Sequence, residues 1–275
     1  MTIGPITLAV SDLTKVIAFY TEGLGLQPLE LSDMGCSLGL DGVPFIHLET
    51  TRDAISHPRA PGLFHIAFLL PSRPALALQL RHLAECGIRL QGASDHLVSE
   101  ALYLADPEGN GIELYCDRPR NKWPYRNGEL QMATEPLNLD DLLSTSTPGA
   151  QWTKMPTGTI LGHIHLQVHD VALATAFYRD LIGLDLTTTY GASAAFLSYD
   201  GYHHHLAVNC WNSRGAALVS GLGLKQFELR VKKLSDIKAR LQSHGVRFTS
   251  DPAGLVTSDP SGNQLRLTPT AASDD

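Results

Sequence analysis

The chain has 275 residues, 43% of them hydrophobic and 18% charged, with a formal net charge of -7, which is typical of a globular protein. It contains no run of basic residues, so nucleic acid, which needs a positive protein face, is disfavoured as a partner. Neither a membrane-length apolar run nor the basic start of a signal peptide is present. The four cysteines are scattered, as is typical of reduced thiols, and we expect a cytoplasmic protein without a membrane partner.

The first predicted strand and helix occur twice in the chain. The pentad ITLAV at 6–10 matches IHLQV at 164–168, and the alternation of apolar residues predicts a half-buried strand. The next segment, SDLTKVIAFYTEGLGL at 11–26, matches HDVALATAFYRDLIGL at 169–184, and its apolar spacing predicts an amphipathic helix. The shared AFY and GL indicate that both halves of the chain follow one plan.

A second unit follows in each half. GLFHIAFLL at 62–70 aligns with GLKQFELRV at 223–231, and a predicted helix follows each of these strands. Each unit closes with DPEGNGIEL at 106–114 or DPSGNQLRL at 259–267, where the DP and GN pairs predict a turn before a strand. The sequence therefore predicts four modules of a strand, a helix and several strands, at 3–50, 62–116, 160–210 and 222–268.

A different segment, 117–159, separates the two halves. It is rich in Pro, Asn, Thr and Ser and contains one short helix-like stretch, LNLDDLLS, so it is predicted to be a long linker. The chain then divides into a domain at 1–116 and a domain at 160–268. The tail at 269–275 is expected to be disordered.

Four βαβββ modules, with openings such as GHIHLQVHD and closings such as DPEGNGIEL, resemble the vicinal oxygen chelate superfamily. This superfamily includes glyoxalases, extradiol dioxygenases and antibiotic-resistance proteins. The resemblance covers nearly the whole chain outside the linker and the tail. It implies an α+β fold in which the modules form two curved, barrel-like mixed sheets with the helices outside.

In that superfamily, metal ligands come from the first and last strands of paired modules. Alignment gives Pro5, His65, His163 and Gln226 in the first strands and His47, Glu113, His205 and Arg266 in the last strands. Proline and arginine have no lone pair to donate, so modules one and four are expected to lack a metal. The resemblance implies a metal centre of His65, Glu113 and His163, with His165 on the same face as His163. This centre requires module two to pair with module three, across the linker.

Two imidazoles and one carboxylate form the facial triad of non-haem Fe(II) oxygenases, which leaves the opposite face of the metal open. We expect Fe²⁺, with Mn²⁺ as the alternative. The segment at 94–115 resembles the extradiol catechol dioxygenases, which implies a catechol-type aromatic diol and O₂ as substrates. The ring would open next to the diol and give a muconic semialdehyde-type product.

Further candidates for the cleft follow from the same resemblance. Extradiol enzymes have a tyrosine ten residues before the ligating glutamate, which is Tyr103 here, and His96 is an additional candidate. A cleft histidine that transfers protons corresponds to His204 by the pattern H-x-(aliphatic)-A and to His205 by module alignment. Adjacent side chains of a strand point to opposite faces, so only one of them is expected in the cleft, with His205 preferred. At least one member of the triplet that begins at His203 is expected to pack elsewhere.

Two other functions remain open from the sequence. A glyoxalase-type isomerase or lyase holds its metal with four protein ligands, and His205 would complete such a set. That chemistry usually needs a second carboxylate as a base, and none is found at the matching positions. A ligand-sequestering resistance protein needs no metal ligands, so the intact triad argues against it. The sequence does not encode the oligomeric state, and a homo-oligomer is compatible with it.

Overall fold

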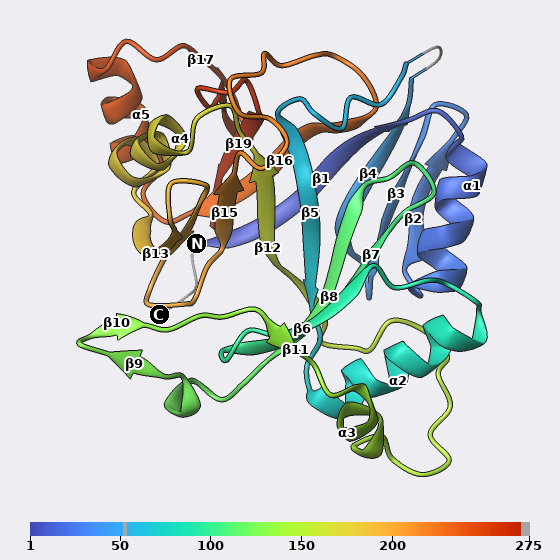
Figure 1. Cartoon of the computed structure of the whole chain (residues 1–275). Coiled ribbons are helices and arrows are strands. Elements are labelled where there is room, and N and C mark those ends of the chain that lie inside the picture. Colours follow the sequence, from blue (N-terminus) through green and yellow to red (C-terminus); the bar gives the residue numbers. More distant parts are fainter. Residues whose placement is uncertain (52–53, 271–275) are drawn as a thin grey trace.

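The strand order shows how the four modules combine in the computed structural model, which describes residues 1–51 and 54–270. Modules one and four form an eight-stranded sheet, and modules two and three form a nine-stranded sheet (Figure 1). Each sheet therefore takes one module from each half of the chain. This pairing across the linker confirms the pairing predicted from the metal-ligand positions, and the mixed α+β architecture confirms the predicted fold class.

The strands of both sheets follow the module plan. In spatial order, the eight-stranded sheet consists of β17 (Phe248–Asp251), β18 (Gly254–Ser258), β19 (Gln264–Pro269), β16 (Gly223–Val231), β1 (Thr2–Val10), β4 (Val43–Thr50), β3 (Gly35–Leu40) and β2 (Gln27–Ser32). The nine-stranded sheet consists of β11 (Glu135–Pro136), β6 (Gly92–Asp95), β7 (Ser99–Ala105), β8 (Gly111–Asp117), β5 (Gly62–Leu69), β12 (Ile160–Gln167), β15 (Leu206–Asn209), β14 (Ala194–Ser198) and β13 (Asp185–Tyr190).

The helices lie outside the sheets, with α1 (Leu13–Ala18) and α2 (Arg73–Glu85) on one side of the molecule and α4 (Val171–Ala176) and α5 (Leu234–Ser243) on the other (Figure 1). In both halves the first helix begins at an aspartate, because Asp12 and Asp170 each accept a hydrogen bond from a backbone N–H three residues later. The helical segments are α1 (Leu13–Ala18), η1 (Phe19–Gly23), α2 (Arg73–Glu85), η2 (Arg120–Lys122), α3 (Leu139–Ser144), α4 (Val171–Ala176), η3 (Phe177–Ile182) and α5 (Leu234–Ser243).

The repeated AFY and DP motifs contact each other in the core. The buried Tyr20 hydroxyl donates a hydrogen bond to Asp106 Oδ2 at 3.4 Å, and in the other half the buried Tyr178 hydroxyl donates to Asp259 Oδ2 at 3.0 Å. Each bond links a helix of one module to the closing turn of the next module in the chain. These bonds therefore hold sequence-adjacent modules together, whereas the sheets join modules from opposite halves.

The two sheets share one hydrophobic core, in which buried residues of all four modules form a single cluster. Phe45 of β4 and Phe68 of β5 meet across the junction of the sheets, with ring centroids 6.1 Å apart. Within the nine-stranded sheet, β5 and β12 pair antiparallel, and β8 runs parallel to β5 on its other side. The order β8–β5–β12 brings the three predicted ligand strands next to one another.

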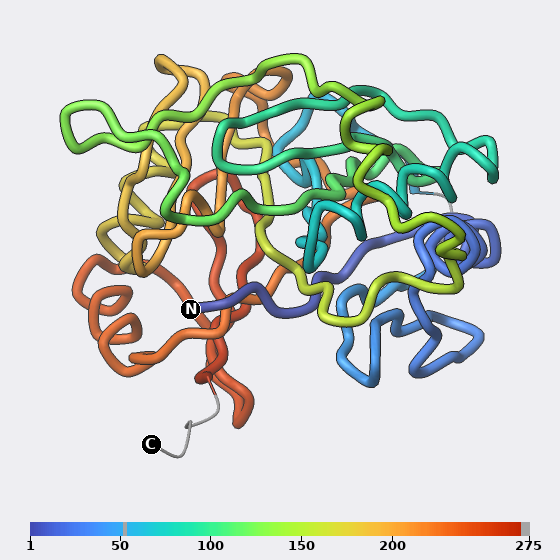
Figure 2. Tube along the Cα trace, turned by 90° about the horizontal axis from the view of Figure 1, so that it is seen from below, coloured from blue at the N-terminus to red at the C-terminus, as the bar shows by residue number. Residues whose placement is uncertain are grey.

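The linker has more structure than its composition predicts. Its strand β11 pairs with β6 and extends the nine-stranded sheet, and its helix α3, which the stretch LNLDDLLS predicted, packs near α2. A small hairpin is formed by β9 (Tyr125–Arg126) and β10 (Glu129–Leu130). Viewed from below, the linker runs along one side of the molecule from this hairpin toward the start of β12 (Figure 2).

Two sequence predictions concern other parts of the chain. No helix among the described residues has the length and apolarity that a membrane crossing requires. The disorder predicted for the tail falls mostly on residues 271–275, which lie outside the described residues, while β19 extends to Pro269.

Candidate metal centre and its cleft

Three buried ligand atoms converge on neighbouring strands of the nine-stranded sheet. The Nε2 atom of His65 lies 3.0 Å from Glu113 Oε2 and 3.3 Å from His163 Nε2, and Glu113 Oε2 lies 3.1 Å from His163 Nε2. The residues come from β5, β8 and β12, respectively. All three are buried, and they are the one His/Cys/Asp/Glu group with metal-binding spacing among the described residues.

The donor set fits a divalent transition metal. Ligand atoms about 2.1 Å from a metal and at right angles to each other lie about 3.0 Å apart, close to the three observed separations. Two imidazole nitrogens and one carboxylate oxygen are also the donor types of non-haem iron sites. Among the described residues, Nδ1 of His163 is buried without a hydrogen-bond partner, so Nε2, which faces the cluster, makes the only polar contacts of this ring.

The charges of the cluster favour metal binding near neutral pH. Burial alone would raise the pKa of Glu113, but the charges and hydrogen bonds of His163 and His65 outweigh it and hold that pKa well below its ordinary value. Burial lowers the pKa of His163 to about 4, although Glu113 opposes this shift. A carboxylate and a neutral imidazole are the forms that coordinate a metal.

The structure places His204, rather than the preferred His205, next to the metal ligands. The ring centroid of His204 lies 4.1 Å from that of His163, and burial together with the neighbouring histidines lowers its pKa well below the ordinary value. The His205 ring instead lies 4.8 Å from the ring of Tyr202, and its Nδ1 accepts a hydrogen bond from the backbone N–H of Tyr199. His205 therefore lies outside the group of candidate ligands.

The expected alternation agrees with the structure for His204 and His205, of which only His204 lies beside the cluster, but it is wrong for His203 and His204. The backbone of His205 already bonds to Leu197 and Ile164 of the neighbouring strands, but His203 and His204 lie further before the start of β15 at Leu206, outside the regular strand. As a result, adjacent rings contact each other, and Nδ1 of His203 lies 2.7 Å from Nδ1 of His204. The expectation that one member of the triplet packs elsewhere holds for His205.

Tyr103 and His96 form a hydrogen-bonded pair beside the cluster. Tyr103 pairs across strands with Glu113, and its ring centroid lies 5.7 Å from that of His65. Nε2 of His96 lies 2.6 Å from the Tyr103 hydroxyl, and Nδ1 of His96 lies 2.6 Å from the carbonyl oxygen of Ala133 in the linker. Because the carbonyl only accepts, Nδ1 carries the proton and Nε2 accepts from Tyr103. Burial and the charge of Glu113 raise the pKa of Tyr103 well above its ordinary value.

An aromatic wall of His165, Phe64 and Trp211 adjoins the cluster, and of these only His165 was predicted from the sequence. The Nε2 atom of His165 lies 3.0 Å from the Asn209 side-chain amide, and the His165 ring lies 4.9 Å from that of His65. The register of β5 against β12 shifts at Phe64, so this ring also contacts His165, at 4.9 Å. Trp211 completes the wall at 5.1 Å from Phe64. Periodicity gives no signal for such a register shift, so the sequence did not reveal Phe64 as a cleft residue.

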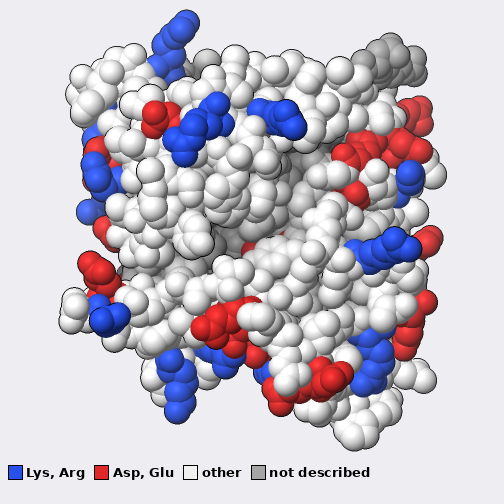
Figure 3. Space-filling view, in the orientation of Figure 1, with Lys and Arg blue, Asp and Glu red and all other residues white. Residues whose placement is uncertain are grey.

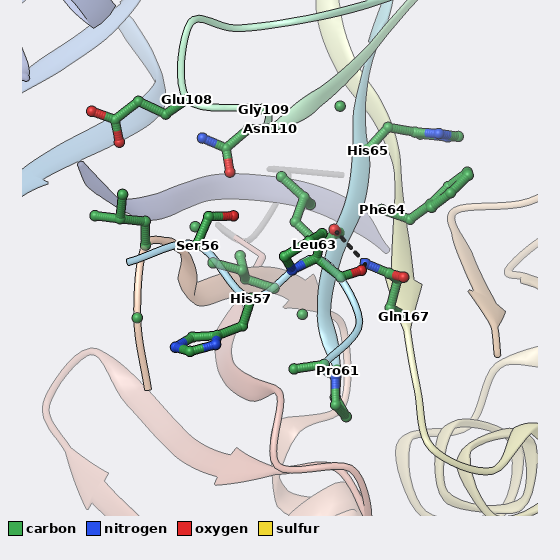
Figure 4. A pocket seen from close by; sticks show the side chains of 18 of the residues that line it. Ser56, His57, Pro61, Leu63, Phe64, His65, Glu108, Gly109, Asn110 and Gln167 are labelled. Carbon is green, nitrogen blue, oxygen red and sulfur yellow. Dashed lines mark hydrogen bonds between the residues drawn. The ribbon is translucent and has the colours of Figure 1, made fainter. Parts of the chain in front are cut away.

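A cavity of about 620 Å³ adjoins this region. Its lining includes Ser56, Asn110 and Gln167 and reaches His65 and Tyr103. In Figure 4 the side chains of His65 and Phe64 lie together on one side of β5, away from Ser56, His57 and Glu108. In the orientation of Figure 1, the space-filling view shows a hollow near the middle of the molecule, with walls largely free of charged side chains (Figure 3).

The equivalent positions in the eight-stranded sheet hold no His/Cys/Asp/Glu group with metal-binding spacing among the described residues. Gln226, the counterpart of His65, lies opposite Thr7 of β1, two residues from Pro5. The Arg266 guanidinium donates to Gln226 Oε1 at 3.2 Å and forms an ion pair with Asp251 at 2.9 Å. A cation thus occupies the position where the other sheet has the carboxylate of Glu113.

Comparisons with known proteins identify the family. The model of the Glyoxalase/Bleomycin resistance protein/Dioxygenase superfamily matches residues 2–114 and 160–267, so the chain belongs to this superfamily. A Bacillus subtilis (strain 168) catechol-2,3-dioxygenase is 42% identical over 219 residues, which cover 78% of this chain and 76% of that protein. A biphenyl-2,3-diol 1,2-dioxygenase of Paraburkholderia xenovorans (strain LB400) is 26% identical over 271 residues, which cover 93% and 78%. These relatives place the chain among the extradiol dioxygenases.

Solved structures share the fold. A putative dioxygenase from Bacillus subtilis superposes with a TM-score of 0.67 at 13% identity, covering 98% of this chain and 86% of that one. Glyoxalase I from Zea mays superposes with a TM-score of 0.58 at 16% identity, covering 98% and 92%. Enzymes of both kinds share this architecture, so the fold alone does not separate them and the site residues decide.

Proposed function

We propose that the protein is an extradiol ring-cleaving dioxygenase that uses O₂ to open a catechol-type aromatic diol at a metal centre of His65, Glu113 and His163. The convergence of these three ligand atoms carries the proposal. Fe²⁺ is the preferred metal, with Mn²⁺ as the alternative, because this ligand set suits both ions. When bound, the metal would hold the two diol oxygens and O₂ side by side and pass electron density from the ring to O₂.

The overall reaction balances without another reactant. One catechol and one O₂ give one ring-opened semialdehyde that contains both atoms of O₂. The bond that breaks is the ring bond next to the diol. The substrate itself supplies the electrons, so the enzyme needs no external reductant.

The neighbouring side chains would bind the substrate and transfer protons. His204 lies beside the proposed metal ligands, and burial lowers its pKa, which favours the neutral imidazole; it would accept a proton from the incoming diol and return it later in the reaction. The hydroxyl of Tyr103, held by His96, would hydrogen-bond a substrate oxygen. The wall formed by Phe64, His165 and Trp211 would pack against the aromatic ring of the substrate.

The two competing functions have less support. The glyoxalase-type function requires a fourth protein ligand, and its candidate His205 faces Tyr202 and the Tyr199 backbone. A ligand-sequestering protein has no use for three buried ligands at metal-binding distances. Neither alternative explains why the chain is 42% identical to one dioxygenase and 26% identical to another.

Single replacements of the ligands test the metal centre. We expect His65→Ala, Glu113→Ala and His163→Ala each to remove most bound iron and ring-cleaving activity, because two remaining ligands hold the ion weakly. Metal content is measured after anaerobic purification, and activity is measured by O₂ uptake with catechol. Gln226→Ala is the matched control, because Gln226 is the counterpart of His65 in the other sheet. Full iron occupancy in all three variants would refute the assignment.

A further inference from the structure

The histidine triplet contains a hydrogen-bond chain that the proposed reaction does not yet use. Nδ1 of His204 lies 2.7 Å from Nδ1 of His203, and Nε2 of His203 lies 3.0 Å from Asp117 Oδ1. His203 is fully buried. The chain of contacts therefore leads from the cleft, through a buried imidazole, to a carboxylate at the end of β8.

The donors and acceptors of this chain follow from simple chemistry. A carboxylate only accepts, so the Asp117 contact requires a proton on Nε2 of His203. A neutral His203 then has its lone pair on Nδ1, and the hydrogen bond between the two Nδ1 atoms needs the proton on His204. This places the lone pair of neutral His204 on Nε2. Among the described residues, that nitrogen has no hydrogen-bond partner, and it faces away from His203.

The surrounding rings fix His203 in this position. Tyr202 packs over it with ring centroids 4.0 Å apart, and Trp123 of the linker lies 5.4 Å away. The Tyr202 hydroxyl donates to the same Asp117 oxygen at 3.2 Å, so the carboxylate is itself held in place. A histidine that only packs in a core needs one hydrogen-bond partner. In His203 both ring nitrogens contact side chains, Nε2 that of Asp117 and Nδ1 that of the cleft residue His204.

We infer that His203 and Asp117 are positioning residues that hold His204 in the tautomer with its proton on Nδ1 and its Nε2 lone pair directed to the cleft. The inference rests on the proposed function, in which His204 accepts a proton from the diol. A base must present a lone pair to the proton it takes, and the opposite tautomer would present an N–H instead. Loss of His203 should therefore slow turnover without weakening the metal site.

Three variants separate this role from simple packing. His203→Phe keeps a ring in the buried position but removes the acceptor for His204. His203→Asn restores an acceptor, since its side-chain oxygen can lie near the former Nδ1 position, but it loses the contact with Asp117. Asp117→Ala removes the end of the chain and leaves His203 free to exchange tautomers. His47→Phe, in the other sheet, controls for the exchange of a histidine for phenylalanine.

The first measurement is the tautomer of His204 itself. Long-range ¹H–¹⁵N spectra of histidine-labelled, metal-free protein distinguish a protonated from an unprotonated ring nitrogen. We expect a protonated Nδ1 and an unprotonated Nε2 for His204 in the unaltered protein and in His203→Asn, and loss of this preference in His203→Phe. A protonated Nε2 in the unaltered protein would overturn the inference, whether or not the protein cleaves catechols.

The second measurement is turnover. We expect kcat for catechol to fall about 10- to 100-fold in His203→Phe, less in Asp117→Ala, and to recover partly in His203→Asn, with KM and iron content nearly unchanged. Unchanged kcat in His203→Phe would overturn the inference. Absence of ring cleavage by the unaltered, iron-loaded enzyme would instead refute the proposed function, while the spectra would still test the hydrogen-bond chain.

Discussion

At the scale of single residues, the site depends on which neighbours share a hydrogen bond. His96 and Tyr103 are separated by seven residues in the sequence, but their polar atoms lie 2.6 Å apart, and the backbone of the linker fixes the histidine from the other side. The tyrosine hydroxyl donates to His96 in this structure. A substrate oxygen would therefore accept the same hydroxyl proton, either together with His96 or in its place. The two side chains are therefore expected to act as one unit.

A double-mutant cycle tests this coupling. We expect Tyr103→Phe and His96→Ala each to lower kcat/KM for catechol, by about 10- to 100-fold, because each removes the same positioned hydrogen bond. The double variant should lose little more than the worse single variant, since coupled residues are not additive. The four kcat/KM values, measured at equal iron content, provide the check. Losses that multiply would show that the two residues act independently.

At the scale of elements, strand packing beneath the ligands leaves no space for larger side chains. Gly162 precedes the ligand His163 on β12, and a Cβ atom built there would lie 1.9 Å from the hydroxyl oxygen of Tyr115 on β8. The tyrosine in turn hydrogen-bonds the hydroxyl of Tyr202 at 2.8 Å. The glycine is thus needed for the close approach of β12 to the Tyr115 side chain of β8.

Replacement of Gly162 tests this packing. We expect Gly162→Ala to lower the free energy of unfolding by about 1–3 kcal/mol, because the new methyl group displaces Tyr115. Combination with Tyr115→Phe, which removes the closest atom, should recover part of the loss. Gly92→Ala is the matched control, because a Cβ atom added to Gly92 on β6 would meet no atom within 4 Å. Denaturant unfolding measures all four proteins, and equal stability of Gly162→Ala and Gly92→Ala would contradict the packing argument.

The sequence predicted regular elements better than local irregularities. The repeated motifs predicted the modules, and the ligand positions predicted the pairing across the linker, because strand periodicity and turn residues are local signals. The structure places His204, rather than the preferred His205, beside the cluster, and the triplet precedes the regular part of strand β15. The register shift at Phe64 and the contact of Ala133 with His96 depend on strand pairing and on the path of the linker. These tertiary effects have no local sequence signal.

At the scale of the whole molecule, two kinds of contact hold the four modules together. The sheets join modules from opposite halves, whereas the buried Tyr–Asp bonds join modules that are adjacent in the chain. Every module is therefore linked to two others, and the shared core connects both sheets. We expect the chain to unfold as one cooperative unit rather than as two halves.

Alkaline pH should reveal these buried contacts. Five tyrosines have a pKa well above the ordinary value, and burial is the main cause in each case. They are Tyr20, Tyr103, Tyr115, Tyr178 and Tyr202. Their contribution to stability is fully present below about pH 10, where the unfolded chain also keeps its phenolic protons. It is lost as the pH rises further, because the unfolded state releases protons that the folded state retains.

The expected result is a steep fall in the free energy of unfolding above about pH 10, with most tyrosinate absorbance appearing together with unfolding. Ultraviolet titration and circular dichroism, recorded on the same samples, measure the two events. Full tyrosine ionisation in a protein that remains folded would contradict the assigned burial.

The central claim is that this chain opens a catechol ring next to the diol with O₂ at the His65, Glu113 and His163 centre. The most direct measurement is mass spectrometry of the product that the anaerobically iron-loaded enzyme forms from catechol and isotopically labelled O₂, with O₂ uptake recorded in parallel. We predict one O₂ consumed per catechol and a yellow muconic semialdehyde that carries two labelled oxygen atoms. A ring-intact product, a dicarboxylic acid without an aldehyde, or no O₂ uptake with either Fe²⁺ or Mn²⁺ would contradict the claim.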